Sequence, residues 1–100
     1  MPVHHLRLYV SGDSSNGRAA RANADRLCAM VLGGCDIEVI DVLIDPAAAE
    51  EARVIATPLL ASRDRGRRVI GDLSDLTQVM TYFEMTPLAD AGDVAGQASA

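Results

Sequence analysis

The first half of the chain has the pattern of a strand, a helix and a second strand, and this order constrains the fold most. Residues 5–10 alternate leucine or valine with polar or aromatic side chains, as a strand with one apolar face does. Residues 18–32 carry apolar side chains at helical spacing, with Ser15 or Asn16 as N-cap. Residues 36–44 are nearly continuously apolar, which predicts a central strand. Strands joined in this way pair in parallel, with a right-handed crossover.

The second half of the chain contains shorter elements. Asp45 and Pro46 predict the N-cap and the first residue of a short helix that extends to residue 55. Two short apolar runs follow, and the compact linker between them contains Gly66, so we expect a β-hairpin with antiparallel strands. Ser74 then predicts the N-cap of a last helix, and Asp75 is favourable in its first turn.

The predicted order of elements is β-α-β-α-β-β-α, and it defines the fold class. A parallel pair and an antiparallel hairpin make a mixed four-stranded α/β sheet with helices on both faces, which is the thioredoxin-like arrangement. Pro58 follows Thr57 at the start of a predicted strand, where this fold carries a cis-proline, so Pro58 is a cis-proline candidate. We expect one domain over residues 1–85 and a flexible tail over residues 86–100.

Charge and composition exclude several classes of partner. The net charge is −5, whereas nucleic acids and anionic membranes need a basic surface, so we expect no nucleic acid and no membrane as partner. All 9 basic residues are arginine, so the chain has no Schiff-base amine and no P-loop cation. It shows neither a signal-peptide pattern nor an apolar run of the roughly 20 residues that span a bilayer. The sequence therefore predicts a cytoplasmic protein.

The reactive side chains do not form a catalytic motif. Residues 11–17, the loop after the first strand, contain no cysteine, although a thioredoxin-like enzyme needs its thiols there. Cys28 and Cys35 have the spacing of neither a redox Cys-x-x-Cys pair nor a zinc knuckle. Two reduced thiols are the favoured interpretation, and a disulfide is the alternative. A phosphate cradle in the loop is a second alternative, although the Walker pattern is absent. We predict a binding module with no enzymatic activity, cofactor or metal.

Three separated motifs resemble the KaiB family of small clock proteins. They are LRLYVSGDSSN at the first strand, EVIDVLIDPAAAEEARVIATPLL in the middle and RRVIGDLSD near the end. They follow the family's order and cover residues 5–85. The resemblance implies a homologue that binds a KaiC-type ring ATPase and modulates its phosphorylation and timing output. A histidine kinase with a thioredoxin-like sensor and a KaiA-like protein are the other implied partners. Signalling through such a kinase or a stress pathway, without a daily clock, is the alternative function.

KaiB-like proteins exchange between two folds, and the resemblance implies the same metamorphic behaviour here. The ground state has the order β-α-β-β-α-α-β and forms dimers or tetramers, whereas the fold-switched state is thioredoxin-like, monomeric and binds KaiC. The short apolar runs after residue 57 fit a helix or a strand equally well, as a switch between two packings requires. The family's longer, proline-containing segment before the Arg-Arg pair is shortened here, which predicts a bias toward the thioredoxin-like state.

The resemblance also implies two sets of functional residues. The expected partner-binding residues are Arg18, Asp45, Pro46, Ala49 and Glu50. The expected fold-switch residues are Gly71, Asp72 and Leu73. Without the resemblance, the first set has the pattern of a capped surface helix and the second that of a strand-to-helix turn. The chain departs from the family at Glu38 and Ile44, where basic residues often sit.

Overall fold

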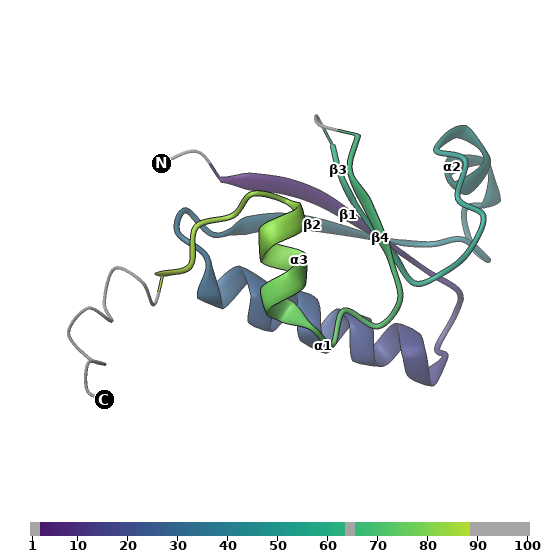
Figure 1. The fold of residues 1–100 in the computed structure, drawn as a ribbon. Coiled ribbons are helices and arrows are strands. Elements are labelled where there is room, and N and C mark those ends of the chain that lie inside the picture. Colours follow the sequence, from purple (N-terminus) through teal and green to yellow (C-terminus); the bar gives the residue numbers. More distant parts are fainter. Residues whose placement is uncertain (1–2, 64–65, 89–100) are drawn as a thin grey trace.

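The computed structural model describes residues 3–63 and 66–88, and its helices and strands follow the predicted order (Figure 1). They are β1 (His4–Val10), α1 (Ser15–Met30), β2 (Cys35–Asp41), α2 (Pro46–Glu51), β3 (Leu59–Ser62), β4 (Arg68–Ile70) and α3 (Leu76–Tyr82). The predicted order β-α-β-α-β-β-α is thereby confirmed. The structure has the thioredoxin-like arrangement of the chain, and not the order β-α-β-β-α-α-β.

The strands form one mixed sheet in the order β2-β1-β3-β4. β1 pairs in parallel with β2, and it pairs antiparallel with β3, which in turn pairs antiparallel with β4. The crossover through α1 makes the first pair parallel, and the short connection between β3 and β4 makes the last pair antiparallel. Gly66 in that connection has a φ of 72°, a left-handed conformation that glycine adopts at low cost.

The prediction that residues 36–44 form a central strand is wrong. β2 ends at Asp41 and lies at the edge of the sheet, because β1 separates it from β3. None of the β2 residues is buried, and the side chain of Val39 is 43% exposed. A continuous apolar run predicts that both faces of a strand are covered, but it does not show how many strands flank it.

The first helix begins before the predicted residue 18. Its N-cap is Ser14, whose Oγ accepts a hydrogen bond from the N–H of Gly17 at 3.0 Å. The predicted caps, Ser15 and Asn16, instead lie in the first turn of α1. Several serine and asparagine side chains in a row can each serve as N-cap, and the sequence does not distinguish between them.

The two later helices are capped by aspartates. Asp45 caps α2 as predicted, and its carboxylate accepts from the N–H of Ala48 at 3.1 Å. Asp75 caps α3 and accepts from the N–H of Gln78 at 3.1 Å, so the prediction of Ser74 as cap is wrong by one residue. Both aspartates bond three residues ahead, which satisfies one free N–H of each helix.

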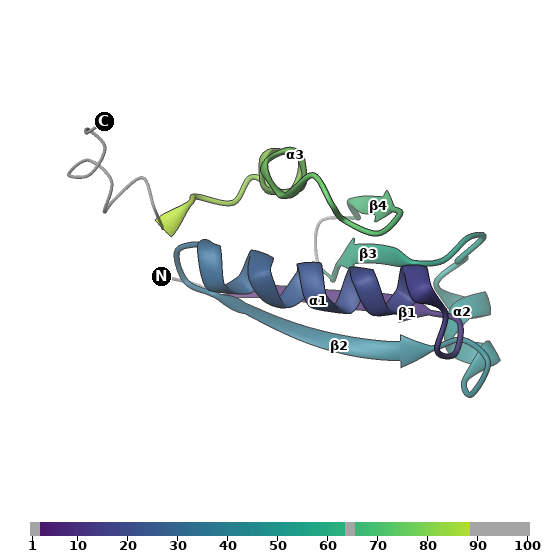
Figure 2. The ribbon, with the colours of Figure 1, turned by 90° about the horizontal axis from the view of Figure 1, so that it is seen from below.

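The hydrophobic core lies between the sheet and the two helices α1 and α3. Both helices cover the same face of the sheet, and α2 lies apart from them at one end of the molecule (Figure 2). No residue of α2 is buried. The main core residues are Leu6, Leu8, Val10, Leu27, Leu60, Leu73, Val79, Met80 and Phe83. Because α2 adds no residue to this core, its position depends on contacts made outside the core.

The segment after α3 contacts the turn after α1. The carbonyl oxygen of Thr86 accepts from the N–H of Leu32 at 2.7 Å, and Pro87 forms an isolated β-bridge with Val31. The tail predicted for residues 86–100 falls largely on residues 89–100, outside the described part of the chain. In the described part, no helix has the length and apolar character needed to cross a membrane.

Candidate functional site

Two hydroxyl groups join the loop after β1 to the segment that leads into β3. The Oγ of Ser11 and the Oγ1 of Thr57 are hydrogen-bonded at 2.8 Å, and the peptide bond between Thr57 and Pro58 is cis. Cys28 lies near the C-terminal end of α1, and Cys35 is the first residue of β2. Neither thiol therefore lies at the start of α1, where a helix N-terminus lowers the pKa of a catalytic cysteine.

Asp41 connects the end of β2 to the loop after β1. Its Oδ1 accepts hydrogen bonds from the main-chain N–H groups of Gly12 and Leu43, both at 2.9 Å. These bonds, first that of Gly12 and then that of Leu43, hold the pKa of the Asp41 carboxyl below its ordinary value, and the charge of Arg21 contributes further. Gly12 has a φ of 59°, and a Cβ there would lie 3.1 Å from the Leu43 side chain. The charged carboxylate of Asp41 therefore joins the end of β2 to the loop after β1.

The predicted partner-binding residues of α2 lie together on one short, exposed element. Asp45 is the N-cap and Pro46 is the first helical residue, so both of them fix the start of α2. Pro46 and Glu50 are exposed, and Ala49 is half-buried. Since the Asp45 carboxylate already accepts the Ala48 N–H, its first role is to shape this helix.

Three apolar side chains beside α2 are exposed. Leu43 and Ile44 precede the helix and are 71% and 81% exposed, and Ile55 follows it and is 88% exposed. We call Leu43, Ile44, Ile55 and the exposed helix residues Pro46 and Glu50 the α2 end. The sequence assigned the three apolar residues to a strand and a helix, because an apolar residue in a continuous run looks like core. Leu43 and Ile44 directly precede the helix start at Asp45 and Pro46, whereas no local signal distinguished Ile55 from a core residue.

Arg18 lies at the same end of the molecule as α2, and among the described residues its hydrogen bonds and ion pair are made with Asp13 and not with α2. It belongs to the first turn of α1, which starts at the same end of the molecule as α2, but the two helices lie on opposite sides of the sheet (Figure 1). Its guanidinium donates to the carbonyl oxygen of Asp13 at 2.7 Å and lies 3.2 Å from the Asp13 carboxylate. The structure thus brings Asp45, Pro46, Ala49 and Glu50 together, and places Arg18 on a separate element.

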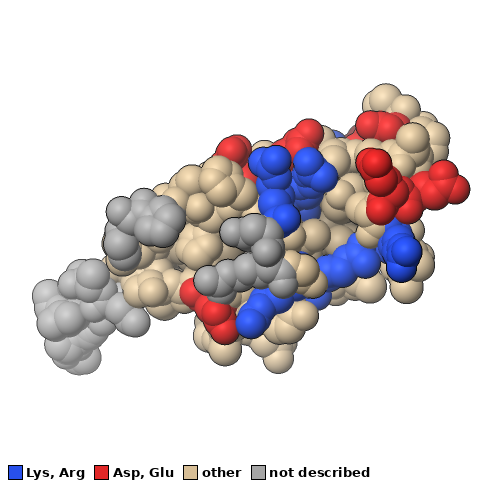
Figure 3. All heavy atoms as spheres, turned by 90° about the horizontal axis from the view of Figure 1, so that it is seen from above, with Lys and Arg blue, Asp and Glu red and all other residues tan. Residues whose placement is uncertain are grey.

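An arginine of β4 holds the end of α2. The guanidinium of Arg68 donates to the carbonyl oxygens of Ala52 and Arg53 at 2.7 and 3.2 Å. Arginines gather on the sheet face opposite α1, and acidic side chains lie at the right-hand end, over α2 (Figure 3). On the same face Arg7 pairs with Glu38, with 3.1 Å between Nε and Oε1. Arg68 therefore connects two short elements of the second half of the chain.

The predicted fold-switch residues form the junction between β4 and α3. Gly71 has a φ of 125°, which an L side chain rarely adopts, and Leu73 has a φ of 63° although its side chain is buried. Such a backbone costs about 1–3 kcal/mol at a residue other than glycine. The N–H of Gly71 donates to the carbonyl oxygen of Pro58 at 2.9 Å, and the Asp72 carboxylate accepts from the N–H of Ser74 at 3.0 Å. At this junction, Leu73 thus combines a strained backbone with a buried side chain.

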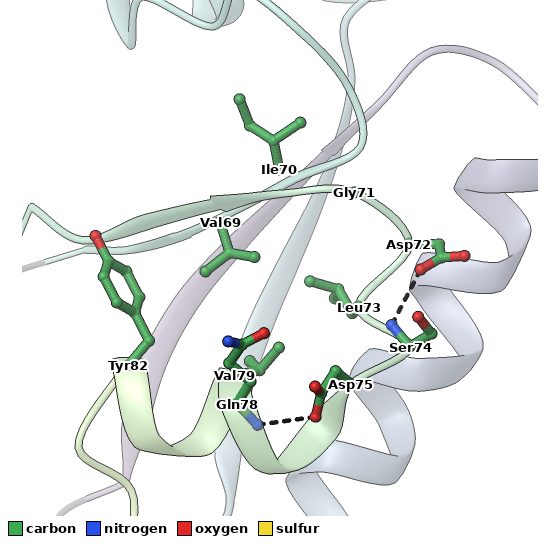
Figure 4. A pocket seen from close by; sticks show the side chains of 10 residues that line it. All are labelled: Val69, Ile70, Gly71, Asp72, Leu73, Ser74, Asp75, Gln78, Val79 and Tyr82. Atoms are coloured by element: carbon green, nitrogen blue, oxygen red, sulfur yellow. Dashed lines mark hydrogen bonds between the residues drawn. The ribbon is translucent and has the colours of Figure 1, made fainter.

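A cavity of about 340 Å³ lies beside this junction, between β4 and α3. Val69, Leu73 and Val79 supply apolar side chains to it, and Tyr82 lies at the other end of α3 from Asp75 (Figure 4). The cavity is open to solvent, so it forms a surface groove beside the junction. In the described residues, no group of three or more His, Cys, Asp or Glu side chains is arranged to hold a metal ion.

Two solved protein structures share the fold of this chain. A solved structure of the N-terminal domain of Synechococcus elongatus SasA has a TM-score of 0.64, with 22% identity over 84% of this chain and 86% of that one. Mitochondrial thioredoxin 3 from Saccharomyces cerevisiae has a TM-score of 0.65, with 16% identity over 84% of this chain and 79% of that one. These likenesses show that the fold is thioredoxin-like.

The relatives in sequence are clock proteins. The circadian clock oscillator protein KaiB of a Synechococcus species is 44% identical over 80% of this chain and 76% of its own length. The circadian clock protein KaiB3 of a Synechocystis species is 38% identical over 82% of this chain and 83% of its own length. The family model described as the KaiB domain matches residues 7–84. The resemblance found in the sequence motifs is therefore confirmed, and the chain belongs to the KaiB family.

Proposed function

We propose that this protein is a non-catalytic regulator that binds a KaiC-type ring ATPase through the α2 end. The observation that carries the proposal is the exposure of Leu43, Ile44 and Ile55 around a helix that has no buried residue. Exposed apolar side chains rimmed by polar ones are typical of a protein–protein interface. Relatives that are named as circadian clock proteins support a partner that belongs to a timing system.

The proposal includes a change of fold in the second half of the chain. Two features of the structure support it: the positive φ of Leu73 at the junction, and the brevity of α2 and β4. A fold switch needs two packings that differ by a few kcal/mol, and a positive φ at Leu73 and short elements both limit the stability of the thioredoxin-like packing. The thioredoxin-like monomer is the form that binds the ATPase, and the β-α-β-β-α-α-β dimer or tetramer is the form that does not bind it.

Size-exclusion chromatography with a hexameric KaiC-type ATPase tests the proposed function. The protein is incubated with the ring for several hours, so that a slow change of fold can complete, and is then separated from it. Co-elution with the hexamer is expected. Complete separation after overnight incubation, with a KaiB relative co-eluting in a parallel run, would count against the proposed partner.

A second candidate function is signalling through a histidine kinase or a stress pathway without a daily clock. Ile44 is 81% exposed at the α2 end and stands where family members often carry a basic residue, so this surface fits a more apolar partner. The same chromatography with a sensor histidine kinase distinguishes the two functions. Co-elution with the kinase alone would favour this second candidate.

A further inference from the structure

A row of side chains crosses all four strands on the sheet face opposite α1. Arg7 of β1 alternates with core residues of its strand and therefore lies on this face. Its register partners are Glu38 in β2 and Ala61 in β3, and Ala61 is in turn the partner of Arg68 in β4. Partners across a sheet point to the same face, and neighbouring strands lie about 4.8 Å apart. The small side chain of Ala61 therefore leaves a space between the two arginines.

This space is an open pocket of about 350 Å³, which we call the arginine pocket. Arg7, Arg63 and Arg68 line it, together with Tyr9, which is 2% exposed. Arg63 directly follows β3, and its N–H donates to the carbonyl oxygen of His5 at 3.0 Å, which continues the pairing of β3 with β1. The three guanidinium groups thus come from three neighbouring parts of the sheet, and arginines gather on this face in Figure 3.

These arginines keep hydrogen-bond donors for a ligand. A guanidinium carries five N–H groups and is always charged in a protein. Arg7 uses its Nε for Glu38, at 3.1 Å from Oε1, and Arg68 uses one terminal nitrogen for the carbonyl oxygens at the end of α2. With the other described residues, the guanidinium of Arg63 makes no hydrogen bond and no ion pair. Among the described residues that line the pocket none is acidic, so positive charge prevails there.

We propose that the arginine pocket binds a small phosphate-type oxyanion, such as inorganic phosphate or diphosphate. The planar guanidinium fork matches two oxygens of a phosphate, and hydrogen bonds between charged partners are stronger than neutral ones. Guanidinium groups from three parts of the sheet suit a tetrahedral group with several oxygens better than a carboxylate, which offers two. Because the chain as a whole carries a net charge of −5, its overall field does not attract anions, and the local cluster supplies the attraction.

The arginine pocket is a different surface from the α2 end. It lies on the face of the sheet and includes Ala52 at the C-terminal end of α2, whereas the α2 end is built from exposed residues of this helix and the apolar residues that flank it. Because the pocket is open to solvent, an oxyanion can enter it without a change of fold. Its test therefore requires no ATPase, and its outcome is independent of the proposed function.

Nuclear magnetic resonance titration of the isotope-labelled full-length protein tests the proposal. Inorganic phosphate and diphosphate are added separately at about 0.1 M sodium chloride, where exposed charges more than about 10 Å apart are largely screened. We expect saturable shifts of the main-chain amides of Arg7, Ala61, Arg63 and Arg68, with a dissociation constant of about 1 mM or below for the tighter anion. The absence of saturable shifts with either anion up to about 10 mM, or shifts confined to other surfaces, would overturn the proposal.

Three charge variants locate the site. Arg63→Gln removes one guanidinium of the pocket and is expected to weaken binding about fivefold. Glu38→Gln removes the carboxylate that competes for Arg7 and is expected to strengthen binding about twofold. Arg26→Gln is the matched control with wild-type affinity expected, because Arg26 is an exposed arginine of α1, on the other face of the sheet. Circular dichroism verifies that the variants keep the native secondary structure. Equal affinity of Arg63→Gln and Arg26→Gln would contradict an anion site in the arginine pocket.

Discussion

The side-chain amide of Asn23 donates a hydrogen bond to the main-chain carbonyl oxygen of Asp72, with 2.8 Å between Nδ2 and O. The bond is partly buried and joins the middle of α1 to the junction between β4 and α3. It therefore stabilises the thioredoxin-like arrangement at the residue where the chain is expected to change its fold.

Asn23→Asp tests this bond with almost no change of shape. The aspartate cannot donate, and its charge would face the Asp72 carbonyl oxygen. We expect a loss of about 1–2 kcal/mol in the free energy of unfolding, measured by urea titration. Arg26→Ala is the control, because it removes only the exposed bond from Arg26 to the Asn23 side chain at 3.2 Å. If both variants lowered the free energy of unfolding equally, the bond to Asp72 would contribute no more stability than the exposed bond from Arg26.

Gly71→Ala tests the strain at the junction. A side chain at a φ of 125° is expected to cost about 1–3 kcal/mol in the thioredoxin-like state and to increase the population of the oligomeric fold. Gly34→Ala is the matched control, since Gly34 also has a positive φ and open space but lies in the first half of the chain. Sedimentation velocity is expected to show more tetramer for Gly71→Ala than for Gly34→Ala. Identical profiles would argue against a switch at this residue.

Asp41→Asn tests the charged group that holds the loop after β1. Because the pKa of Asp41 is lowered in the folded state, its charge stabilises the fold above the unfolded pKa of about 3.9, and this stability is lost as the pH falls through the folded pKa. The variant is expected to be less stable than the wild type at neutral pH and to lose less stability between pH 7 and about pH 3. Equal acid-induced losses in the urea midpoint would contradict this role.

Chemical shifts of the free protein in solution test the bias toward the thioredoxin-like state. The shortened hairpin linker and Gly66 favour β4, so residues 67–71 are expected to show extended backbone shifts in a monomer. Helical shifts for these residues in a dominant tetramer would show that the ground state is the other fold.

The order of the elements was predictable because each one leaves a local signal. The helix start at Asp45 and Pro46 and the glycine in the hairpin linker are examples that the structure confirms. The edge position of β2 was not predictable, because an apolar run carries no information about neighbouring strands. The bond between Asn23 and Asp72 was missed as well, since the two residues are 49 positions apart and an asparagine in a helix has no periodic signature.

The candidate site was only partly predictable for the same reason. The sequence motifs located α2 and the junction, but exposure depends on what packs nearby in three dimensions. Leu43, Ile44 and Ile55 have the composition of core residues and lie in solvent, because α2 is too short to cover them. Hydrophobicity alone therefore placed the interface residues inside the fold.

Binding of the double variant Ile44→Ser/Ile55→Ser to a hexameric KaiC-type ATPase tests the central claim most directly. Met30→Ser is the matched control, because Met30 is an exposed apolar residue, 38% exposed, at the far end of α1. Biolayer interferometry is expected to show wild-type affinity for Met30→Ser and at least tenfold weaker binding for the double variant, about 1.4 kcal/mol or more. Wild-type affinity of the double variant, or equal losses in both variants, would contradict binding through the α2 end.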